Sequence, residues 1–190
     1  MGEKPLVKSP FPPFLAFILD NPLRRVLIDR ERFLRGMGVK EGDHVLEIGC
    51  GPGFFTETLS MIVGENGRVY AQDVEEAMVE RVRRKSAGFR FSNVVPLLSN
   101  SSLIALAPGS CNVALCANVI EEIYKEGELE GTVAELDRVL RKPAVVIVKE
   151  HRFGGTGPMV RKAEKLMLNL GYEKVLEEVT FFSYHMRFRK

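Results

Sequence analysis

The 190-residue sequence has few cysteines, and their number and spacing exclude two kinds of cysteine-based stabilisation. Cys50, Cys111 and Cys116 cannot all pair, and no two of them have the Cys-x-x-Cys spacing of a zinc site. Neither a disulfide framework nor a bound metal is therefore predicted. Because unpaired cysteines are typical of proteins in a reducing compartment, we expect the protein to be cytoplasmic.

Long hydrophobic runs are also missing. The longest apolar stretch near the start, Phe11 to Leu19, has nine residues, and two of them are prolines. A helix that spans a bilayer needs about 20 apolar residues. The stretch is not followed by the small-residue cleavage site of a secretory signal. No membrane span is therefore expected.

Charge of one sign is not in excess. The 27 basic and 25 acidic residues leave a formal net charge of +2. A nucleic-acid-binding domain normally carries a strongly basic face, so nucleic acid is an unlikely partner. With 45% hydrophobic and 27% charged residues, the composition is that of an ordinary globular protein, and the length predicts one domain covering residues 1–190.

The domain begins with a helical lead-in of about residues 1–40. Apolar residues recur at helical spacing in Phe14 to Leu19 and again between Leu23 and Leu34, and the second segment ends near Gly36 to Gly38.

From His44 onward, short apolar strands alternate with amphipathic helices, which is typical of parallel βαβ units. The predicted strands are 45–48, 68–72, 94–98, 113–117 and 144–148, with helices at 56–62, 75–85 and 128–141. A helix over 158–170 follows, and then strands 172–179 and 181–188, which are too close together to be anything but an antiparallel hairpin. The fold class is therefore α/β, with helices on both faces of the sheet.

The first of these strands runs into three glycines at alternate positions, Gly49, Gly51 and Gly53. Glycines at a strand-to-helix turn allow a tight turn and close approach of a ligand, although a crossover without any ligand is the simpler alternative. A dinucleotide site would need a further glycine where Thr56 stands. Glu47 would repel a pyrophosphate but attract a cation, so the turn favours a positively charged ligand.

The second strand ends at Asp73, 22 residues after Gly51. An acidic residue at about this distance can accept hydrogen bonds from the two hydroxyls of a ribose. Alternatively, Asp73 caps the helix that follows it. The two roles are compatible.

These segments together resemble the class I S-adenosylmethionine (SAM)-dependent methyltransferases, specifically the small-molecule branch that includes ubiquinone and menaquinone biosynthesis enzymes. The resemblance covers about residues 22–148 and rests on four motifs: 45–53 (VLEIGCGPG), 69–73 (VYAQD), 112–122 (NVALCANVIEE) and 136–143 (LDRVLRKP). It implies a Rossmann-like doubly wound sheet of order 3-2-1-4-5-7-6 with strand 7 antiparallel. It also implies SAM as cofactor and S-adenosylhomocysteine (SAH) as product.

The resemblance assigns cofactor contacts by position. It places the methionine end at the glycine turn, the ribose on Asp73, the adenine beside Val74 and the loop after strand three, and the transferring methyl near Asn118. In that loop, Asn100 stands where the family usually has an aspartate that contacts the adenine amino group. The predicted cofactor-binding residues are Glu47, Gly49, Cys50, Gly51, Gly53, Asp73, Val74, Asn100, Ser101 and Asn118.

A general base is optional, because the methyl carbon on a sulfonium is already activated and alignment supplies most of the catalysis. His151, after strand five, is the preferred candidate, and Tyr124 is a second one. Other candidates at the same mouth are Glu121, Glu122, Tyr184 and His185. For each of them, a solvated loop residue is the simpler interpretation.

Two functional hypotheses follow. The first is a SAM-dependent methyltransferase that acts by in-line displacement on a small, apolar or aromatic acceptor. The second is a catalytically silent SAM-binding interaction protein, suggested by asparagines at positions 100 and 112, where the family usually has aspartate. The acceptor walls in such folds come from variable loops, so the sequence does not identify the acceptor.

Overall fold

The computed structural model describes residues 29–90, 92–152 and 155–190. Most of the predicted lead-in, including the pattern over Phe14 to Leu19, lies outside the described residues. Within them, α3 (Arg30–Gly36) ends where the pattern predicts, and Asp29 caps its first turn by accepting from the Arg32 N–H at 2.9 Å. That residues 1–190 form a single domain stays a prediction.

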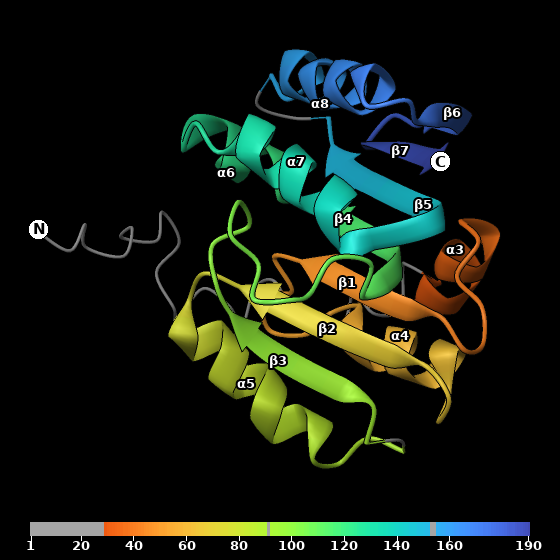
Figure 1. Ribbon diagram of the computed structural model, residues 1–190, viewed down its shortest axis with the longest axis vertical. Coiled ribbons are helices and arrows are strands. Elements are labelled where there is room, and N and C mark those ends of the chain that lie inside the picture. The colour runs from red at the N-terminus through yellow and green to blue at the C-terminus, as the bar shows by residue number, and fades with distance from the viewer. Residues whose placement is uncertain (1–28, 91, 153–154) are drawn as a thin grey trace, which may run out of the picture.

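The described strands form one seven-stranded sheet of order β3-β2-β1-β4-β5-β7-β6 (Figure 1). Strands β1 to β5 are parallel to one another, whereas β7 is antiparallel to both β5 and β6. The bounds are β1 (His44–Ile48), β2 (Arg68–Asp73), β3 (Val94–Leu98), β4 (Cys111–Ala117), β5 (Leu140–His151), β6 (Glu173–Val179) and β7 (Ser183–Arg189). The predicted α/β class, the strand order and the reversed strand are confirmed.

Helices cover both faces of this sheet because successive strand side chains point to opposite sides. In β1, Leu46 and Ile48 face a core built with α6, α7 and α8, whereas Val45 faces a core built with α3 and α4. The remaining helix, α5, packs against β2 and β3. The helix bounds are α4 (Thr56–Val63), α5 (Glu76–Ser86), α6 (Ile120–Lys125), α7 (Leu129–Val139) and α8 (Gly157–Asn169).

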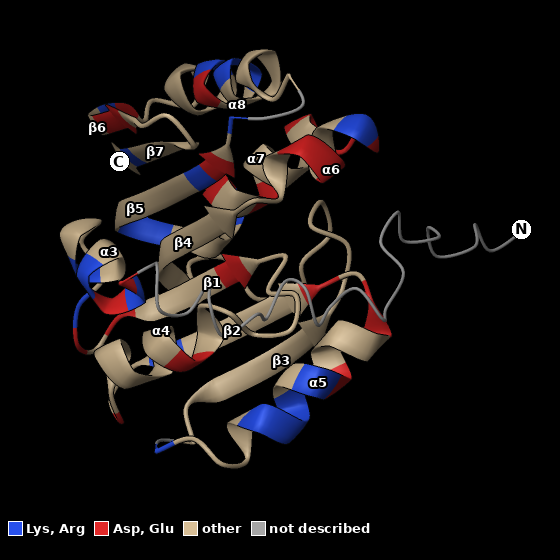
Figure 2. Ribbon diagram, turned by 180° about the vertical axis from the view of Figure 1, so that it is seen from behind, with Lys and Arg blue, Asp and Glu red and all other residues tan. Residues whose placement is uncertain are grey.

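The distribution of buried and charged residues follows these layers of helices and sheet. The neighbouring strands β1 and β4 are buried along most of their length, as expected for parallel strands covered on both faces. In α5, Met78, Val79 and Val82 are buried, and the last turn carries basic residues that complement the helix dipole (Figure 2). None of the helices in the described ranges is long and apolar enough to cross a bilayer.

Asn112 fixes the amino ends of the two central strands. Its Oδ1 accepts from the N–H of His44 at 2.8 Å, and its Nδ2 donates to Oδ1 of Asp43 at 2.7 Å. An aspartate at this position would instead bring two carboxylates together. The asparagine therefore suits its neighbour Asp43 and joins β1 to β4.

Several element bounds differ by a few residues from the sequence-based prediction, and one short helix was missed. The predicted helix over 128–141 ends at Val139, because β5 begins directly at Leu140 and extends to His151. The six-residue helix α6 was not predicted, since a segment of that length contains too few turns to show a helical period.

Candidate functional site

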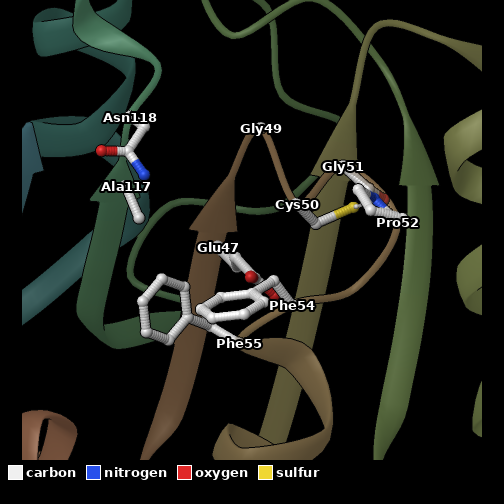
Figure 3. Close-up of a pocket in the computed structure, with 9 residues that line it drawn as sticks. All are labelled: Glu47, Gly49, Cys50, Gly51, Pro52, Phe54, Phe55, Ala117 and Asn118. Carbon is white, nitrogen blue, oxygen red and sulfur yellow. Dashed lines mark hydrogen bonds between the residues drawn. The ribbon is translucent and has the colours of Figure 1, made fainter. Parts of the chain in front are cut away.

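A pocket opens between the carboxyl ends of β1 and β4. This is the point where the strand order changes direction, because β1 connects to β2 on one side and β4 connects to β5 on the other. Ligands of open α/β sheets bind at such switch points. The pocket has a volume of about 120 Å³, well above the roughly 10 to 15 Å³ that one water needs. Its lining residues are Glu47, Gly49, Cys50, Gly51, Pro52, Phe54, Phe55, Ala117 and Asn118 (Figure 3).

All three glycines of the turn have positive φ, and the first two differ in their surroundings. Gly49 has φ +63°, and a Cβ there would lie 2.6 Å from Cγ2 of Val119, so only glycine fits. Gly51 has φ +52°, but a Cβ there would meet nothing within 4 Å. The first glycine is required by packing, whereas the second leaves open space at the pocket wall.

Gln72 holds the turn from the neighbouring strand. Its backbone carbonyl accepts from the Cys50 N–H at 2.9 Å, and its side-chain Oε1 accepts from the Gly49 N–H at 3.3 Å. Its Nε2 donates to the carbonyl of Ser99 in the loop after β3. This buried side chain, the only glutamine in the chain, links three strand ends and was not predicted as a site residue.

Glu47 provides a buried carboxyl group on the pocket wall. The residue is 3% exposed, and its Oε2 accepts from Oγ1 of Thr56 at 2.7 Å. Burial raises the pKa of Glu47 to about 8, and the nearby charge of Asp73 adds to the increase, while the Thr56 hydrogen bond opposes it. At neutral pH the carboxyl group is therefore mostly protonated, and a cation in the pocket would favour its ionised form.

Asp73 lies at the end of β2, next to the glycine turn. Its Oδ2 accepts from the Gly51 N–H at 2.8 Å, and its Oδ1 accepts from the Glu75 N–H at 2.9 Å. Burial raises the pKa of this carboxyl group, and the backbone hydrogen bonds oppose the rise. Each carboxylate oxygen can accept a second hydrogen bond, so Asp73 has capacity left for a ligand.

Asn118 follows β4 on the opposite side of the pocket. Its φ of +54° makes it the only non-glycine residue with left-handed backbone among the described residues. Its N–H donates to the carbonyl of Lys149 in β5 at 2.7 Å. Asparagine tolerates this conformation better than most residues, and backbone strain of this kind is common at functional sites.

Phe54 and Phe55 form an aromatic wall that the sequence-based assignment missed. Their rings are 4.9 Å apart between centroids and nearly perpendicular, and both line the pocket near Glu47 (Figure 3). A ring face attracts a cation, and a neighbouring carboxylate adds to that attraction. The wall and Glu47 together make this end of the pocket suitable for an organic cation.

The other predicted cofactor residues lie outside the pocket lining. Val74 is 38% exposed just beyond Asp73, and Gly53, with φ +86°, packs near Val82 of α5. In the loop after β3, Oδ1 of Asn100 accepts from both N–H and Oγ of Ser102 at 2.9 and 3.0 Å. The Ser101 hydroxyl is buried and bonds Thr132 of α7 at 2.7 Å.

Cys50 does line the pocket, but its side chain has no role as a nucleophile. Its Sγ lies 3.6 Å from the carbonyl of Gly51, and burial raises the thiol pKa well above its ordinary value. Any contribution of Cys50 to ligand binding therefore comes from its backbone and its shape.

The candidate bases lie at the same edge of the sheet but do not line the pocket. His151 contacts Glu150 and Glu121. Tyr124 is 38% exposed, and its ring faces Nζ of Lys162 at 5.1 Å. In the hairpin, His185 bonds Oγ of Ser183 at 2.9 Å, and burial lowers the pKa of its imidazole.

Comparisons with known proteins show the family to which the chain belongs. Residues 45–143 match the family model described as "Methyltransferase domain", which is about half of the chain and contains the glycine turn, Asp73 and Asn118. The chain belongs to the methyltransferase domain family. The match confirms the predicted membership of the methyltransferases, and the relatives below bear out the resemblance to small-molecule SAM-dependent members of class I.

Among solved structures, this methyltransferase is similar to a SAM-dependent methyltransferase from Aquifex aeolicus. The TM-score is 0.83 at 29% identity, over 94% of this chain and 98% of that one.

Among curated proteins, it is 39% identical over 69 residues to a probable cobalt-precorrin-6B C(15)-methyltransferase (decarboxylating) of Saccharolobus solfataricus. That match covers 36% of this chain and 35% of the relative. It is 26% identical over 119 residues to the demethylmenaquinone methyltransferase of Lactobacillus johnsonii, over 57% of this chain and 49% of the relative. The matches thus span about a third to a half of these curated relatives.

Proposed function

We propose that the chain binds SAM in the pocket between β1 and β4 and transfers its methyl group to a small, apolar or aromatic acceptor. The observation that carries the proposal is the placement of Glu47, Gly51 and Asn118 around one pocket at the switch point of the sheet. The pocket thus has a buried carboxyl group, a glycine whose missing Cβ leaves open space, and an asparagine with left-handed backbone.

The residues present fit the proposed cofactor. SAM supplies a methyl group on a positively charged sulfur. Glu47 and the Phe54–Phe55 wall would hold the cationic methionine end, and the space beside Gly51 would admit the chain of the ligand without a clash. Asp73, which keeps one lone pair on each oxygen, would accept from the ribose hydroxyls.

The chemistry required of the protein is alignment and exclusion of water. Glu47 is the one acidic or basic residue among the lining residues, and it would pair with the cation of SAM, so the rest of the pocket wall offers aromatic rings and backbone groups to the acceptor. An apolar acceptor is supported by the L. johnsonii relative, whose name gives demethylmenaquinone as its acceptor. The three cysteines are unpaired and buried, in keeping with our expectation of a cytoplasmic protein.

The test is calorimetric titration of SAH, the methyl-transfer product, into the wild-type protein and two variants. Asp73→Ala removes a predicted ligand contact, whereas Glu65→Gln changes an exposed carboxylate at the amino end of β2, the opposite edge of the sheet. We expect wild type and Glu65→Gln to bind SAH equally and Asp73→Ala to bind much more weakly. A wild-type protein that binds neither SAH nor SAM would overturn the proposal.

Turnover is tested separately by methyl transfer from radiolabelled SAM to a panel of small quinols and phenols. Incorporation of label by the wild-type protein, lost in Asp73→Ala, supports the enzyme. SAH binding without transfer to any acceptor of the panel would instead favour the silent-binder hypothesis.

A further inference from the structure

A cluster of ionisable side chains lies beside the pocket at the carboxyl ends of β4 and β5. The Nδ1 of His151 is 2.6 Å from Oε1 of Glu150, and its Nε2 is 3.1 Å from Oε2 of Glu121. The ring is thus held between two carboxyl groups, one on each nitrogen.

This cluster adjoins the proposed methyl-transfer position. Ala117 pairs with Lys149 across β4 and β5, and the Asn118 N–H bonds the Lys149 carbonyl at 2.7 Å. His151 follows Lys149 by two residues, so it lies on the strand next to Asn118 and at the same edge of the sheet. It is the candidate base that the topology brings near the lined pocket.

Glu150 is a buried hydrogen-bond acceptor. It has no exposed surface, and its oxygens face three donors: the Ile120 N–H to Oε2 at 2.9 Å, and the His151 N–H and ring Nδ1 to Oε1 at 3.0 and 2.6 Å. Both oxygens already accept from backbone N–H groups, and a carboxylate that accepts at each oxygen takes its third hydrogen bond from Nδ1–H. A buried polar contact of this kind also fixes the orientation of the ring.

The other ring nitrogen, Nε2, is the one available for proton transfer. The His151 side chain is 37% exposed, and Nε2 faces Glu121, which is also bonded by Lys125. That hydrogen bond from Lys125 is the main cause that lowers the pKa of Glu121. The Glu121 carboxylate can only accept, so its hydrogen bond with Nε2 forms when the ring is an imidazolium, whereas in the neutral ring with Nδ1–H, Nε2 presents a lone pair. Nε2 is therefore the ring nitrogen that can exchange a proton with an oxygen atom beside it.

We propose that Glu150 is a positioning residue that fixes His151 with Nδ1–H inward, so that Nε2 is the atom that accepts the proton of an O–H or N–H methyl acceptor. This proposal rests on the proposed function. The acceptor lone pair forms the new bond to the methyl carbon, the carbon–sulfur bond breaks with its electron pair remaining on sulfur, and the acceptor proton moves to Nε2. The resulting imidazolium is stabilised by Glu150, and the acceptor atom takes the place of the Glu121 carboxylate.

The experiment is NMR of the imidazole nitrogens in ¹⁵N-histidine-labelled protein without cofactor, at a pH where the ring is neutral. His151 is assigned by His151→Gln. We expect the wild type to show a protonated Nδ1 and an unprotonated Nε2, Glu121→Gln to keep that pattern, and Glu150→Gln to lose it. An Nε2–H ring in the wild type, or an unchanged pattern in Glu150→Gln, would overturn the proposal. The wild-type spectrum decides the question even if Glu150→Gln does not fold.

A kinetic readout separates positioning from mere stability. With an O–H or N–H acceptor that is turned over, Glu150→Gln should lower kcat about tenfold or more, leave the KM for SAM unchanged and alter the pH profile. Glu126→Gln, an exposed carboxylate at the end of α6, should change none of these. An equal change in both variants would contradict the role of Glu150. If the protein binds SAH but the neutral His151 ring carries its proton on Nε2, this inference alone is overturned. If the ring carries its proton on Nδ1 but the protein does not bind SAH, the proposed function is overturned.

Discussion

The backbone N–H of Gly51 donates to Oδ2 of Asp73 across 2.8 Å. This contact joins the glycine turn to the end of β2, while the other oxygen of Asp73 accepts from Glu75 just before α5. The predicted alternatives for Asp73, ligand contact and local support of the next helix, therefore use different lone pairs of one carboxylate. Asp73 can organise the turn before any ligand arrives.

Asp73→Ala is expected to weaken SAH binding by about 2 to 3 kcal/mol, or roughly 30- to 150-fold, through loss of charge-assisted hydrogen bonds. It should also lower the free energy of unfolding by about 1 to 3 kcal/mol, because the N–H groups of Gly51 and Glu75 lose their acceptor. Calorimetry and urea unfolding measure the two effects. SAH affinity within threefold of wild type would show that Asp73 does not contact the ribose.

The affinity for SAH is expected to rise with pH between about 6 and 7.5. In the ligand-free protein the pKa of Glu47 is about 8, so the group is mostly protonated, and the ammonium of SAH favours its ionised form. Binding therefore releases a proton, and affinity should increase by up to about tenfold per pH unit. Glu47→Gln should abolish this dependence. Calorimetry in buffers of different ionisation enthalpy measures how many protons are released on binding. A wild-type affinity that does not change with pH would contradict the assignment of Glu47 to the SAH ammonium.

Gly49→Ala and Gly51→Ala are expected to differ although both glycines have positive φ. Each costs about 1 to 2 kcal/mol of stability for left-handed backbone, but only the Gly49 Cβ also meets Val119, at 2.6 Å. Gly49→Ala should therefore be the less stable, and Val119→Ala should restore part of the loss. Urea unfolding of Gly49→Ala, Gly51→Ala and the double variant Gly49→Ala/Val119→Ala measures these free energies. Equal stabilities of the two single variants, with no gain in the double variant, would mean that the turn does not pack as described.

Asn118→Gly and Asn118→Ala separate backbone strain from side-chain function. At φ +54°, glycine is unstrained and alanine is not, so the glycine variant should be the more stable by roughly 1 kcal/mol. Both lack the side-chain amide and should lose methyl transfer to a similar extent. Thermal unfolding and turnover are the measurements. Full activity in a folded Asn118→Gly protein would remove Asn118 from the site.

Asn100→Asp is expected to hold or improve SAH affinity by up to about 1 kcal/mol. Both lone pairs of the Asn100 Oδ1 are used by Ser102, so the second carboxylate oxygen of an aspartate would be a new acceptor for the adenine amino group. Asn100→Leu should lose affinity together with the turn. Weaker binding by the aspartate variant and unchanged binding by the leucine variant would show that Asn100 does not face adenine.

Local patterns predicted the parts of this molecule that depend on neighbouring residues. The apolar run of Val45 to Ile48 and the three glycines after it predicted β1 and its turn, because a buried parallel strand and a positive φ each leave a direct mark on residue type. The spacing from Gly51 to Asp73 predicted an acidic residue that faces a ribose, which stays a prediction, and the hydrogen bond between the two residues places Asp73 beside the glycine turn.

Features that depend on distant packing could not be predicted. The Ser101 hydroxyl bonds Thr132, 31 residues away, and nothing in the loop sequence indicates that partner. The pairing of His151 with Glu121 requires the unpredicted helix α6 and the full length of β5. Phe54 and Phe55 were visible in the motif, but which way their rings face is set by how α4 begins.

The central claim, a SAM site between β1 and β4, is tested most directly by mapping SAH binding on the backbone amide NMR spectrum. We expect saturable shifts of the amides of Gly49, Gly51, Asp73 and Asn118, with none at Glu65, at the opposite edge of the sheet. An unchanged spectrum at saturating SAH, or shifts confined to residues away from this pocket, would contradict the account.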